Sequence, residues 1–367
     1  MKHTMLAAVA ESAQAPLAVR QIDRPVPGQG QVLVRVNAAG VNPLDTKIAA
    51  GAGAHARQAL PAVLGLDLAG TVVELGEAVE GFTVGQEVFG MPGGIGGAQG
   101  TMAEYIAVDA RLIAAKPHTL DMREAAALPL VFITAWEGLV DRANVRAGQR
   151  VLIHGGAGGV GQVAVQLAKA RGADVYATGS AASLDFIRSL GATAIDYQAQ
   201  SVEDYVEHYT AGEGFDIVYD TVGGSTLDAS FKAVKAYTGH VLSCLGWGQH
   251  SLAPLSFKSA TYPGAAAHRQ RARTPRRYPA RGRRAGQCWS TDDPRRSTAL
   301  CAARRQRGIS PSRGRSRQGQ DGHPVGEGIV PWDPWFNERF RADGCLLTSI
   351  FLVGARRAER SSARPSR

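Results

Sequence analysis

The chain has 367 residues, of which 44% are hydrophobic and 20% are charged, and it carries 44 glycines and a formal net charge of +9. This composition excludes collagen and a disordered polyelectrolyte, and the length suggests two domains that can each bury a core. The charge is unevenly placed, because residues 1–262 have a net charge of −6 and the remainder, with 23 Arg and no Lys, has +15. The body of the chain therefore gives no reason to expect a nucleic-acid partner.

Cysteine usage follows the same division. Cys244 is the only cysteine in the body of the chain, so no disulfide framework and no clustered zinc site are expected there. The first ten residues lack the pattern of a secretory signal, and no apolar run approaches the roughly 20 residues of a membrane span. We expect a cytoplasmic protein without membrane contact.

Residues 1–120 are predicted to form short strands separated by turns. Residues 31–36 alternate apolar and polar side chains, as a half-buried strand does. Residues 63–76 are apolar and β-branched with glycines at bends, residues 84–90 follow after a turn, and residues 92–100 form a glycine-rich loop. Short strands with frequent Gly and Pro indicate a small, partly closed β-barrel.

The pattern changes near residue 122, where helical and strand-like segments begin to alternate. Such alternation with short connections predicts an α/β fold with a doubly wound parallel sheet. The expected helices cover residues 122–128, 134–142, 160–171 and 184–190, and the expected strands cover residues 150–154, 173–178, 194–197, 216–220 and 239–244.

A glycine-rich hexad at residues 156–161 satisfies the pattern G-x-G-x-x-G. The pattern is weak alone, but this one directly follows a predicted strand and opens a predicted helix. The glycines allow a tight turn and close approach of the backbone to a pyrophosphate, which the free N–H groups of the helix N-terminus can bind. The sequence therefore predicts a dinucleotide site with contacts from Gly156, Ala157, Gly158, Gly159, Val160 and Gly161.

The end of the next strand bears on the choice of cofactor. An acidic residue there would bind the ribose 2′-hydroxyl of NAD, and none is present. Thr178 and Ser180 offer neutral hydroxyls instead, which favours NADP(H) over NAD(H), although these residues could also form an ordinary polar turn.

Four segments, one of which contains the glycine hexad, carry a family resemblance. They are residues 40–47 (Gly-Val-Asn-Pro-Leu-Asp-Thr-Lys), 64–70 (Leu-Gly-Leu-Asp-Leu-Ala-Gly), 154–161 and 215–224 (Phe-Asp-Ile-Val-Tyr-Asp-Thr-Val-Gly-Gly). In this order, over about residues 5–262, they resemble the medium-chain dehydrogenase/reductase superfamily in its zinc-independent, quinone oxidoreductase-like branch. The resemblance implies a GroES-like β-barrel domain, a Rossmann domain and an active site in the cleft between them.

The positions of the zinc ligands in the metal-dependent relatives hold other residues here. Those relatives have a catalytic Cys where this chain has Asn42 and a Gly-His-Glu where it has Leu66-Asp67, and the cysteines of their structural-zinc lobe are replaced by residues 92–100. We therefore expect no metal, which disfavours alcohol oxidation through a zinc-stabilised alkoxide. Reduction of quinones or activated double bonds remains, because an electron-poor acceptor needs less activation.

The resemblance also implies roles for individual residues. Asn42 is expected near the nicotinamide and the acceptor, and Asp45 is expected to fix that loop, although both residue types are also ordinary turn formers. His154 and Cys244 are expected to be packed structural residues. The remaining implied cofactor contacts are Thr134 on the nicotinamide side, Tyr197 beside the adenosine phosphate, and Leu245 and Gly246 bordering the nicotinamide amide.

The resemblance stops abruptly after Tyr262. The Arg-rich composition that follows predicts an irregular or disordered tail. Arg without Lys, beside Ala, Gly and Pro, is also what GC-rich coding DNA gives in a wrong reading frame. A one-base shift makes residues 274–290 compatible with an amphipathic helix and residues 318–321 with Lys-Gly-Lys-Met. We hypothesise a frameshift from about residue 263, with an authentic arm that binds RNA or DNA as the alternative.

These observations predict three segments and one leading function. The segments are a GroES-like catalytic domain (1–122), a Rossmann NADP(H)-binding domain (123–262) and the Arg-rich tail (263–367). The function expected is metal-free, NADPH-dependent reduction of a quinone or an α,β-unsaturated carbonyl compound. The alternatives are a catalytically silent NADPH-binding protein and a zinc-independent alcohol dehydrogenase. The homodimer edge that the family forms is doubtful with this tail, and this version could be inactive.

Overall fold

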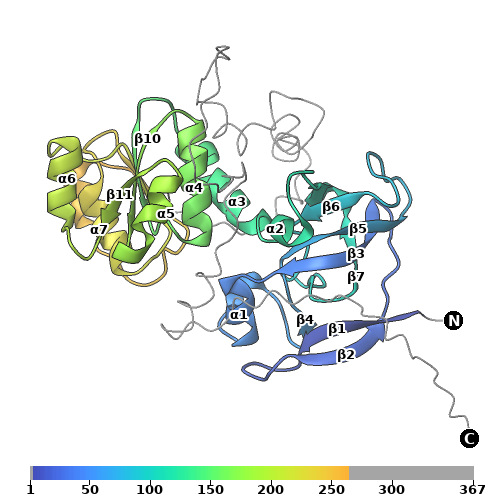
Figure 1. Cartoon of the computed structure of the whole chain (residues 1–367). Helices are drawn as coiled ribbons and strands as arrows, with labels where there is room; N and C mark the ends of the chain where they lie inside the picture. Colours follow the sequence, from blue (N-terminus) through green and yellow to red (C-terminus); the bar gives the residue numbers. More distant parts are fainter. Residues whose placement is uncertain (1–2, 264–367) are drawn as a thin grey trace, which may run out of the picture. The chain divides into compact units, whose positions relative to one another are not determined.

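The computed structural model describes residues 3–263, and the predictions for the Arg-rich tail lie outside these residues. The described chain divides into two compact units, one that ends at Leu130 and one that begins at Val131 (Figure 1). The domain boundary predicted at residue 122 stays a prediction.

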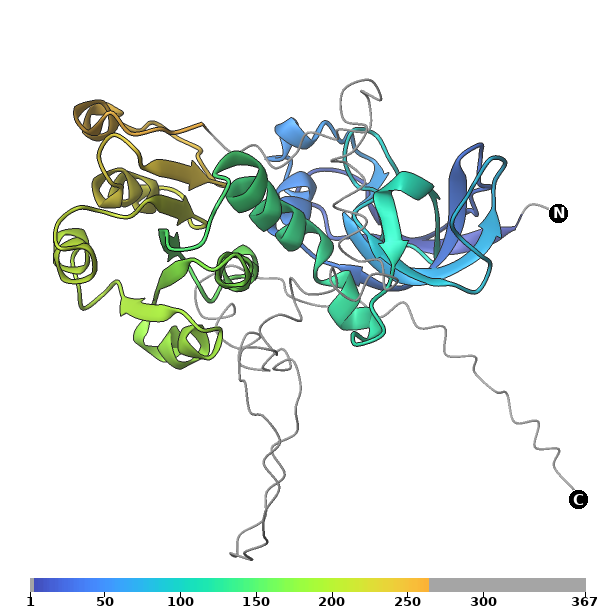
Figure 2. The same ribbon diagram turned by 90° about the horizontal axis from the view of Figure 1, so that it is seen from above.

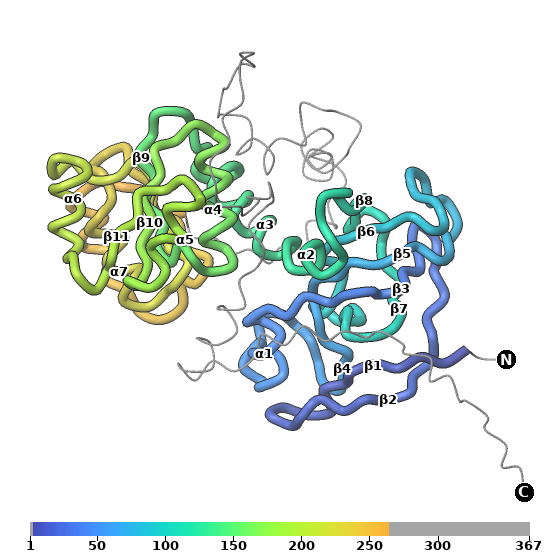
Figure 3. Tube along the Cα trace, viewed as in Figure 1, coloured from blue at the N-terminus to red at the C-terminus, as the bar shows by residue number. Residues whose placement is uncertain are grey.

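The first unit is built on two antiparallel sheets, as the predicted barrel requires (Figure 3). A three-stranded sheet has the order β2-β1-β4, and a five-stranded sheet has the order β7-β3-β5-β6-β8. The strands are β1 (Thr4–Ala10), β2 (Ala18–Asp23), β3 (Gln31–Gly40), β4 (Ala62–Val63), β5 (Asp67–Leu75), β6 (Glu87–Gly90), β7 (Tyr105–Asp109) and β8 (Ile113–Ala115). The helices are α1 (Pro43–Ala49), α2 (Met122–Ala126) and the short 3₁₀ helices η1 (Ala54–Ala56) and η2 (Ala110–Leu112).

The apolar stretch at residues 63–76 is interrupted between β4 and β5. Gly65 has a φ of +103°, and a Cβ atom there would lie 2.4 Å from Thr101 Oγ1. Only glycine fits this bend, which starts β5 at Asp67 and buries Leu66 and Leu68 completely in the unit's core. The bend therefore determines where the Asp67 side chain is placed.

The second unit contains the predicted doubly wound sheet. All five strands are parallel, in the order β11-β10-β9-β12-β13, and Figure 2 shows helices on both sides of them. The strands are β9 (Arg150–His154), β10 (Asp174–Gly179), β11 (Thr193–Asp196), β12 (Ile217–Asp220) and β13 (His240–Ser243). The helices are α3 (Pro129–Trp136, which begins in the first unit), the π-helix η3 (Glu137–Arg142), α4 (Gly159–Ala170), η4 (Ala181–Ser183), α5 (Leu184–Ser189), α6 (Val202–Thr210), α7 (Ser225–Ala233) and α8 (Ala253–Lys258).

Strand β9 is central in this sheet because its three inner residues are apolar. Val151, Leu152 and Ile153 are completely buried, as expected for a strand covered on both faces. The strand order reverses between β9 and β12, and ligands of open α/β sheets bind at the carboxyl ends of the strands at such a point. The loops after β9 and β12 are therefore where the fold positions a ligand.

Helix length bears on membrane insertion. None of the helices among residues 3–263 combines the length and the apolar character that crossing a bilayer requires.

Candidate functional site

The glycine-rich turn joins β9 to α4, as the sequence predicts. Gly155 has a φ of +72°, the Gly156 N–H donates to the Thr178 carbonyl at 2.9 Å, and the Gly158 N–H donates to the Gly155 carbonyl at 2.9 Å. A Cβ atom on Gly161 would lie 2.0 Å from the Gly155 carbonyl oxygen. The last glycine of the hexad is therefore required for the helix to start this close to the strand.

The first turn of α4 carries unused hydrogen-bond donors. Gly158 is the N-cap and has no side chain to accept from the helix. Within residues 3–263, the N–H groups of Gly159, Val160 and Gly161 donate to no protein acceptor. These donors and the positive end of the helix dipole form a cradle that suits a pyrophosphate. The residues present therefore fit a dinucleotide.

Thr178, a predicted cofactor contact, is held beneath this turn. Its hydroxyl oxygen accepts from the Gly155 N–H at 3.2 Å and lies 3.2 Å from His154 Nδ1. His154 is 3% exposed, and burial lowers its pKa to about 4, so it is a packed neutral side chain, as predicted. The Thr178 hydroxyl thus supports the turn, and its contact with a ribose phosphate stays a prediction. Ser180 is only half-buried, and its carbonyl accepts from Ser183 Oγ at 2.9 Å.

Asp220, at the end of β12, was missed in the sequence as a functional candidate. It is completely buried, and its Oδ1 accepts from the N–H groups of Val222 and Gly223 at 3.0 and 2.9 Å. Its Oδ2 accepts from Ser243 Oγ at 2.7 Å. An acidic residue directly before Thr-Val-Gly-Gly at a strand end was the available signal. Asp220 organises the loops after β12 and β13, beside the glycine turn.

Leu245 and Gly246 lie in the loop that follows β13. The Leu245 N–H donates to Ser243 Oγ at 3.1 Å, and a Cβ atom on Gly223 would lie 2.7 Å from the Leu245 carbonyl oxygen. A Cβ atom on Gly246 would lie 2.4 Å from Tyr262 Oη. The predicted nicotinamide-bordering segment is therefore packed against the loop that Asp220 organises. Their contact with a cofactor stays a prediction.

Three other residues of the second unit lie at separate places. Thr134 is buried in α3, and its carbonyl accepts from the Tyr219 hydroxyl at 2.9 Å. Tyr197 follows β11 at the edge of the sheet and is 57% exposed, and its contact with a cofactor stays a prediction. Cys244 packs at the end of β13, where burial raises the pKa of its thiol to about 12. No thiolate nucleophile is therefore expected there.

The first unit places the predicted pair Asn42 and Asp45 in a buried polar cluster. The Asn42 N–H donates to Asp45 Oδ2 at 2.8 Å, and the Asp45 N–H donates to the Asn42 carbonyl at 2.9 Å. Asn42 Nδ2 also donates to Asp67 Oδ2 at 2.9 Å. Asp45 therefore fixes the loop before α1, as expected, and Asp67 fixes the amide of Asn42. The direct catalytic roles of Asn42 and Asp45 stay predictions.

The two carboxyls of this cluster are 2% and 1% exposed, for Asp45 and Asp67 respectively. Burial raises the pKa of Asp45 to about 7, and it raises the pKa of Asp67 to about 8, against the hydrogen bonds that they accept. Asp67 accepts from the Leu130 N–H at 3.1 Å, whereas Asp45 Oδ1 has no hydrogen-bond partner. The cluster therefore retains protons near neutral pH. Asp67 was noticed in the sequence only as a replacement for a zinc ligand.

The cluster does not fit a zinc ion. It offers two carboxyls and an amide, without Cys or His. Zinc in proteins is held by at least three side chains drawn from Cys, His, Asp and Glu, and the cluster has only two of these. Among the residues that the structure describes, no group of three or more His, Cys, Asp and Glu side chains is arranged to hold a metal.

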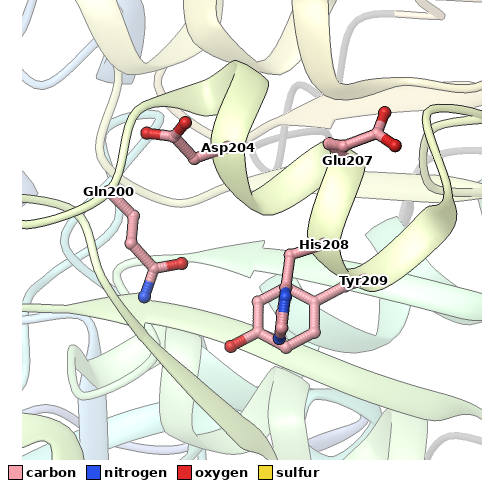
Figure 4. Close-up of a pocket in the computed structure, with 5 residues that line it drawn as sticks. All are labelled: Gln200, Asp204, Glu207, His208 and Tyr209. Atoms are coloured by element: carbon pink, nitrogen blue, oxygen red, sulfur yellow. The ribbon is translucent and has the colours of Figure 1, made fainter.

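A surface hollow of about 450 Å³ lies elsewhere, on helix α6. Gln200, Asp204, Glu207, His208 and Tyr209 line it (Figure 4). The carboxylates of Asp204 and Glu207 point away from the His208 and Tyr209 rings, which meet edge to face at 4.5 Å. The hollow thus has no convergent set of polar groups, and it does not include the glycine turn.

Comparisons with known proteins agree with this geometry. Residues 28–118 match the family model for the alcohol dehydrogenase GroES-like domain, and residues 159–273 match the model for zinc-binding dehydrogenases. The chain is 44% identical over 214 residues to 2-methylene-furan-3-one reductase of Solanum lycopersicum. It is 42% identical over 214 residues to the chloroplastic NADPH-dependent alkenal/one oxidoreductase of Arabidopsis thaliana. Each match covers 56% of this chain and 53% of the relative, so the chain spans about half the length of these curated relatives.

This chain covers a larger share of the solved structures to which it is similar. An alcohol dehydrogenase superfamily protein from Novosphingobium aromaticivorans is 62% identical, with a TM-score of 0.70 over 71% of this chain and 78% of that one. The quinone oxidoreductase from Coxiella burnetii is 31% identical, with a TM-score of 0.63 over 72% of this chain and 84% of that one. The chain therefore belongs to the medium-chain dehydrogenase/reductase superfamily of oxidoreductases, and it is related to alkenal/one reductases and quinone oxidoreductases.

Proposed function

We propose that this protein is an NADPH-dependent oxidoreductase that transfers a hydride, without a metal, to a quinone or an α,β-unsaturated carbonyl compound. The observation that carries the proposal is the glycine turn at the point where the strand order reverses, with the open N–H groups of Gly159, Val160 and Gly161 above it.

The roles of the chain's own groups follow from their positions. The three open N–H groups of α4 would hold the pyrophosphate, and the loops ordered by Asp220 would border the nicotinamide end. NADPH, when bound, supplies the hydride. The protein's task is then to bind, orient and exclude water, which Leu245 and Gly246 would do with their backbone.

Two observations favour NADPH over NADH. No acidic residue follows β10 at Ser180, where it would repel a 2′-phosphate. The Arabidopsis relative, 42% identical, bears an NADPH-dependent name. A ratio of dissociation constants measured with the two cofactors tests this preference.

The acceptor class follows from the polar cluster of the first unit. With no zinc ligand set among the described residues, activation of an unconjugated alcohol or ketone has no support. Asn42 keeps its amide in a single orientation because Asp67 accepts from Nδ2. A fixed amide of this kind can orient the nicotinamide or a conjugated acceptor.

An acceptor screen tests the function. NADPH consumption is followed with a benzoquinone and an alkenal, and the reverse reaction with NADP⁺ and an alcohol. For Asn42→Ala we expect kcat to fall about tenfold while the NADPH dissociation constant is unchanged. The matched control is Asn37→Ala, which removes only the hydrogen bond from Thr71 Oγ1 in the same unit. Tight NADPH binding without turnover on any acceptor would instead favour a binding protein.

A second proposal concerns the tail. We propose that residues from about 263 onward are read in a shifted frame. The support is that this tail has 23 Arg and no Lys, whereas residues 1–262 contain both residue types. Sequencing the genomic DNA decides this. A shifted frame that is closed between codons 263 and 325 refutes the proposal. The homodimer expected for the family is tested on the frame-restored protein by its mass in solution.

A further inference from the structure

The loop after β13 is held to helix α7 by one histidine. His250 Nδ1 lies 3.0 Å from Asp228 Oδ1, and His250 Nε2 lies 3.0 Å from the Trp247 carbonyl oxygen. Asp228 belongs to α7, whereas Trp247 and His250 belong to the loop. The ring therefore ties the loop both to itself and to the neighbouring helix.

Both partners of this ring are acceptors. A carboxylate and a backbone carbonyl cannot donate a hydrogen bond, so each ring nitrogen must carry a proton for both contacts to form. A neutral imidazole has only one N–H and would lose one of the two contacts. The geometry thus requires the imidazolium form.

The surrounding charges agree with that form. Among the described residues, the charged groups that act on the ring are Asp228 on α7 and Asp220 at the end of β12, and both are acidic. The hydrogen bond to Trp247, then that to Asp228, raises the pKa of His250 above its ordinary value, with smaller contributions from the two negative charges. The His250 side chain is 12% exposed and that of Asp228 is 50% exposed, so solvent screens the charge–charge attraction and the two hydrogen bonds carry the contact.

The loop that His250 closes contains the segment predicted to border the nicotinamide. The Trp247 N–H donates to the Leu245 carbonyl at 2.8 Å, and the Leu245 N–H donates to Ser243 Oγ, which donates to Asp220. The loop is therefore anchored at its start by the buried carboxylate and at its end by His250. If the end is released, only the anchor at the start of the loop remains.

We propose that His250, in its doubly protonated form, is a positioning residue for the cofactor, and that it holds the Leu245–His250 loop in the shape that binds the nicotinamide end of NADPH. The proposal rests on the proposed function. It assigns to this oxidoreductase a dependence of cofactor affinity on the charge of a residue that does not touch the cofactor.

Titration of the full chain with NADPH at several pH values tests the proposal. We expect the NADPH dissociation constant to rise about fivefold as the pH is raised and His250 loses its proton. For His250→Gln the weak binding should persist at every pH, because the amide does not titrate and both of its N–H donors are on one nitrogen, so it does not replace the two ring contacts. Any pH dependence that comes from the cofactor itself is the same for this variant and for the wild type, so the difference between the two profiles reports on His250. For Asp228→Asn the midpoint should move to lower pH.

A histidine of the other unit provides the control. His118 is exposed in the first unit, and His118→Gln should keep the wild-type profile. An independent readout is the NMR titration of the His250 ring, identified by the signal lost in His250→Gln, whose midpoint should lie above the ordinary value and match the binding profile.

The outcomes separate this inference from the function. Firm NADPH binding with the same pH profile in wild type and His250→Gln, or a His250 midpoint at or below the ordinary value, overturns the inference and leaves the function standing. Absence of NADPH binding at every pH overturns the proposed function and the inference together.

Discussion

Each of the two units buries a polar cluster, and the two clusters respond to pH with opposite sign. In the first unit, burial raises the pKa values of Asp45 and Asp67 to about 7 and about 8. In the second unit, burial lowers the pKa of His154 to about 4, while Asp220 has hydrogen-bond donors for both of its oxygens. Desolvation is the same cause in both units, and it favours the uncharged forms of Asp45, Asp67 and His154.

The difference has a thermodynamic consequence. The carboxyls of the first unit have raised pKa values, so their stabilising contribution is complete below the unfolded value of 3.8 and is lost as the pH rises towards 7 or 8. His154 has a lowered pKa, so its contribution is complete above 6.5 and is lost as the pH falls towards 4. These carboxyls therefore stabilise the first unit most at acidic pH, whereas His154 stabilises the second unit most above pH 6.5.

The largest expected effect disrupts the second unit alone. In Gly161→Ala the new Cβ atom would lie 2.0 Å from the Gly155 carbonyl oxygen, which is backbone and cannot move aside. We expect a loss of about 3 kcal/mol in the stability of this unit and loss of NADPH binding. Hydrogen exchange, read separately for the two units, measures the change, and the first unit should be unaffected.

Gly159→Ala is the matched control for that variant. Its Cβ atom would meet only the end of the Val131 side chain, at 3.3 Å. The stability of the second unit should change little in Gly159→Ala. An equal loss of stability in both variants would show that the close approach at Gly161 is not the reason for the loss.

Replacing His154 removes the acid sensitivity of the second unit. In His154→Asn the amide can reach Thr178 but cannot become charged. We expect the second unit of the wild type to lose about 3 kcal/mol of stability between pH 6.5 and pH 4, and the second unit of the variant to lose much less. Urea unfolding at a series of pH values provides the comparison. A variant with the wild-type slope would mean that other groups cause the acid loss.

The opposite dependence is tested in the first unit with Asp45→Asn. The amide oxygen can still accept from the Asn42 N–H, while the cost of burying a carboxylate disappears. Above about pH 7 we expect the variant to be about 2 kcal/mol more stable, because the new buried N–H offsets part of the gain. The advantage should vanish below the ordinary value of 3.8, and a constant advantage at all pH values contradicts the raised pKa.

The smallest effect concerns the thiol beside the second cluster. With its pKa raised to about 12, Cys244 should react with iodoacetamide far more slowly than a free thiol near pH 8.5, and peptide mass mapping identifies it. Urea should restore the ordinary rate. Fast labelling of the folded protein would show that this edge of the sheet is open.

Much of the second unit could be predicted from the sequence, because its signals are local. The glycine hexad follows its strand directly, and only the Gly161 spacing lets helix α4 start there. Asp220 was missed because its meaning depends on a partner 23 residues away. Ser243 reaches it only when β12 and β13 pair in parallel with Asp220 opposite Ser243.

The first unit was predicted less completely for the same reason. Asn42 and Asp45 are three residues apart, and their mutual hydrogen bonds could be expected of a turn before a helix. Asp67 joins them only because the bend at Gly65 and the pairing of Gly40 with Asp67 bring β5 alongside. Long-range register, which no local pattern encodes, decides the composition of both clusters.

The most direct test of the proposed function is an acceptor comparison, made with the chain as written and with the frame restored after residue 262. NADPH consumption is measured with an alkenal, with a benzoquinone and with an unconjugated ketone, in the presence of a zinc chelator. We expect turnover of a conjugated acceptor, unchanged by the chelator, and none of the ketone. NADPH bound without any turnover, or ketone reduction that the chelator abolishes, would contradict a metal-free reductase of conjugated acceptors.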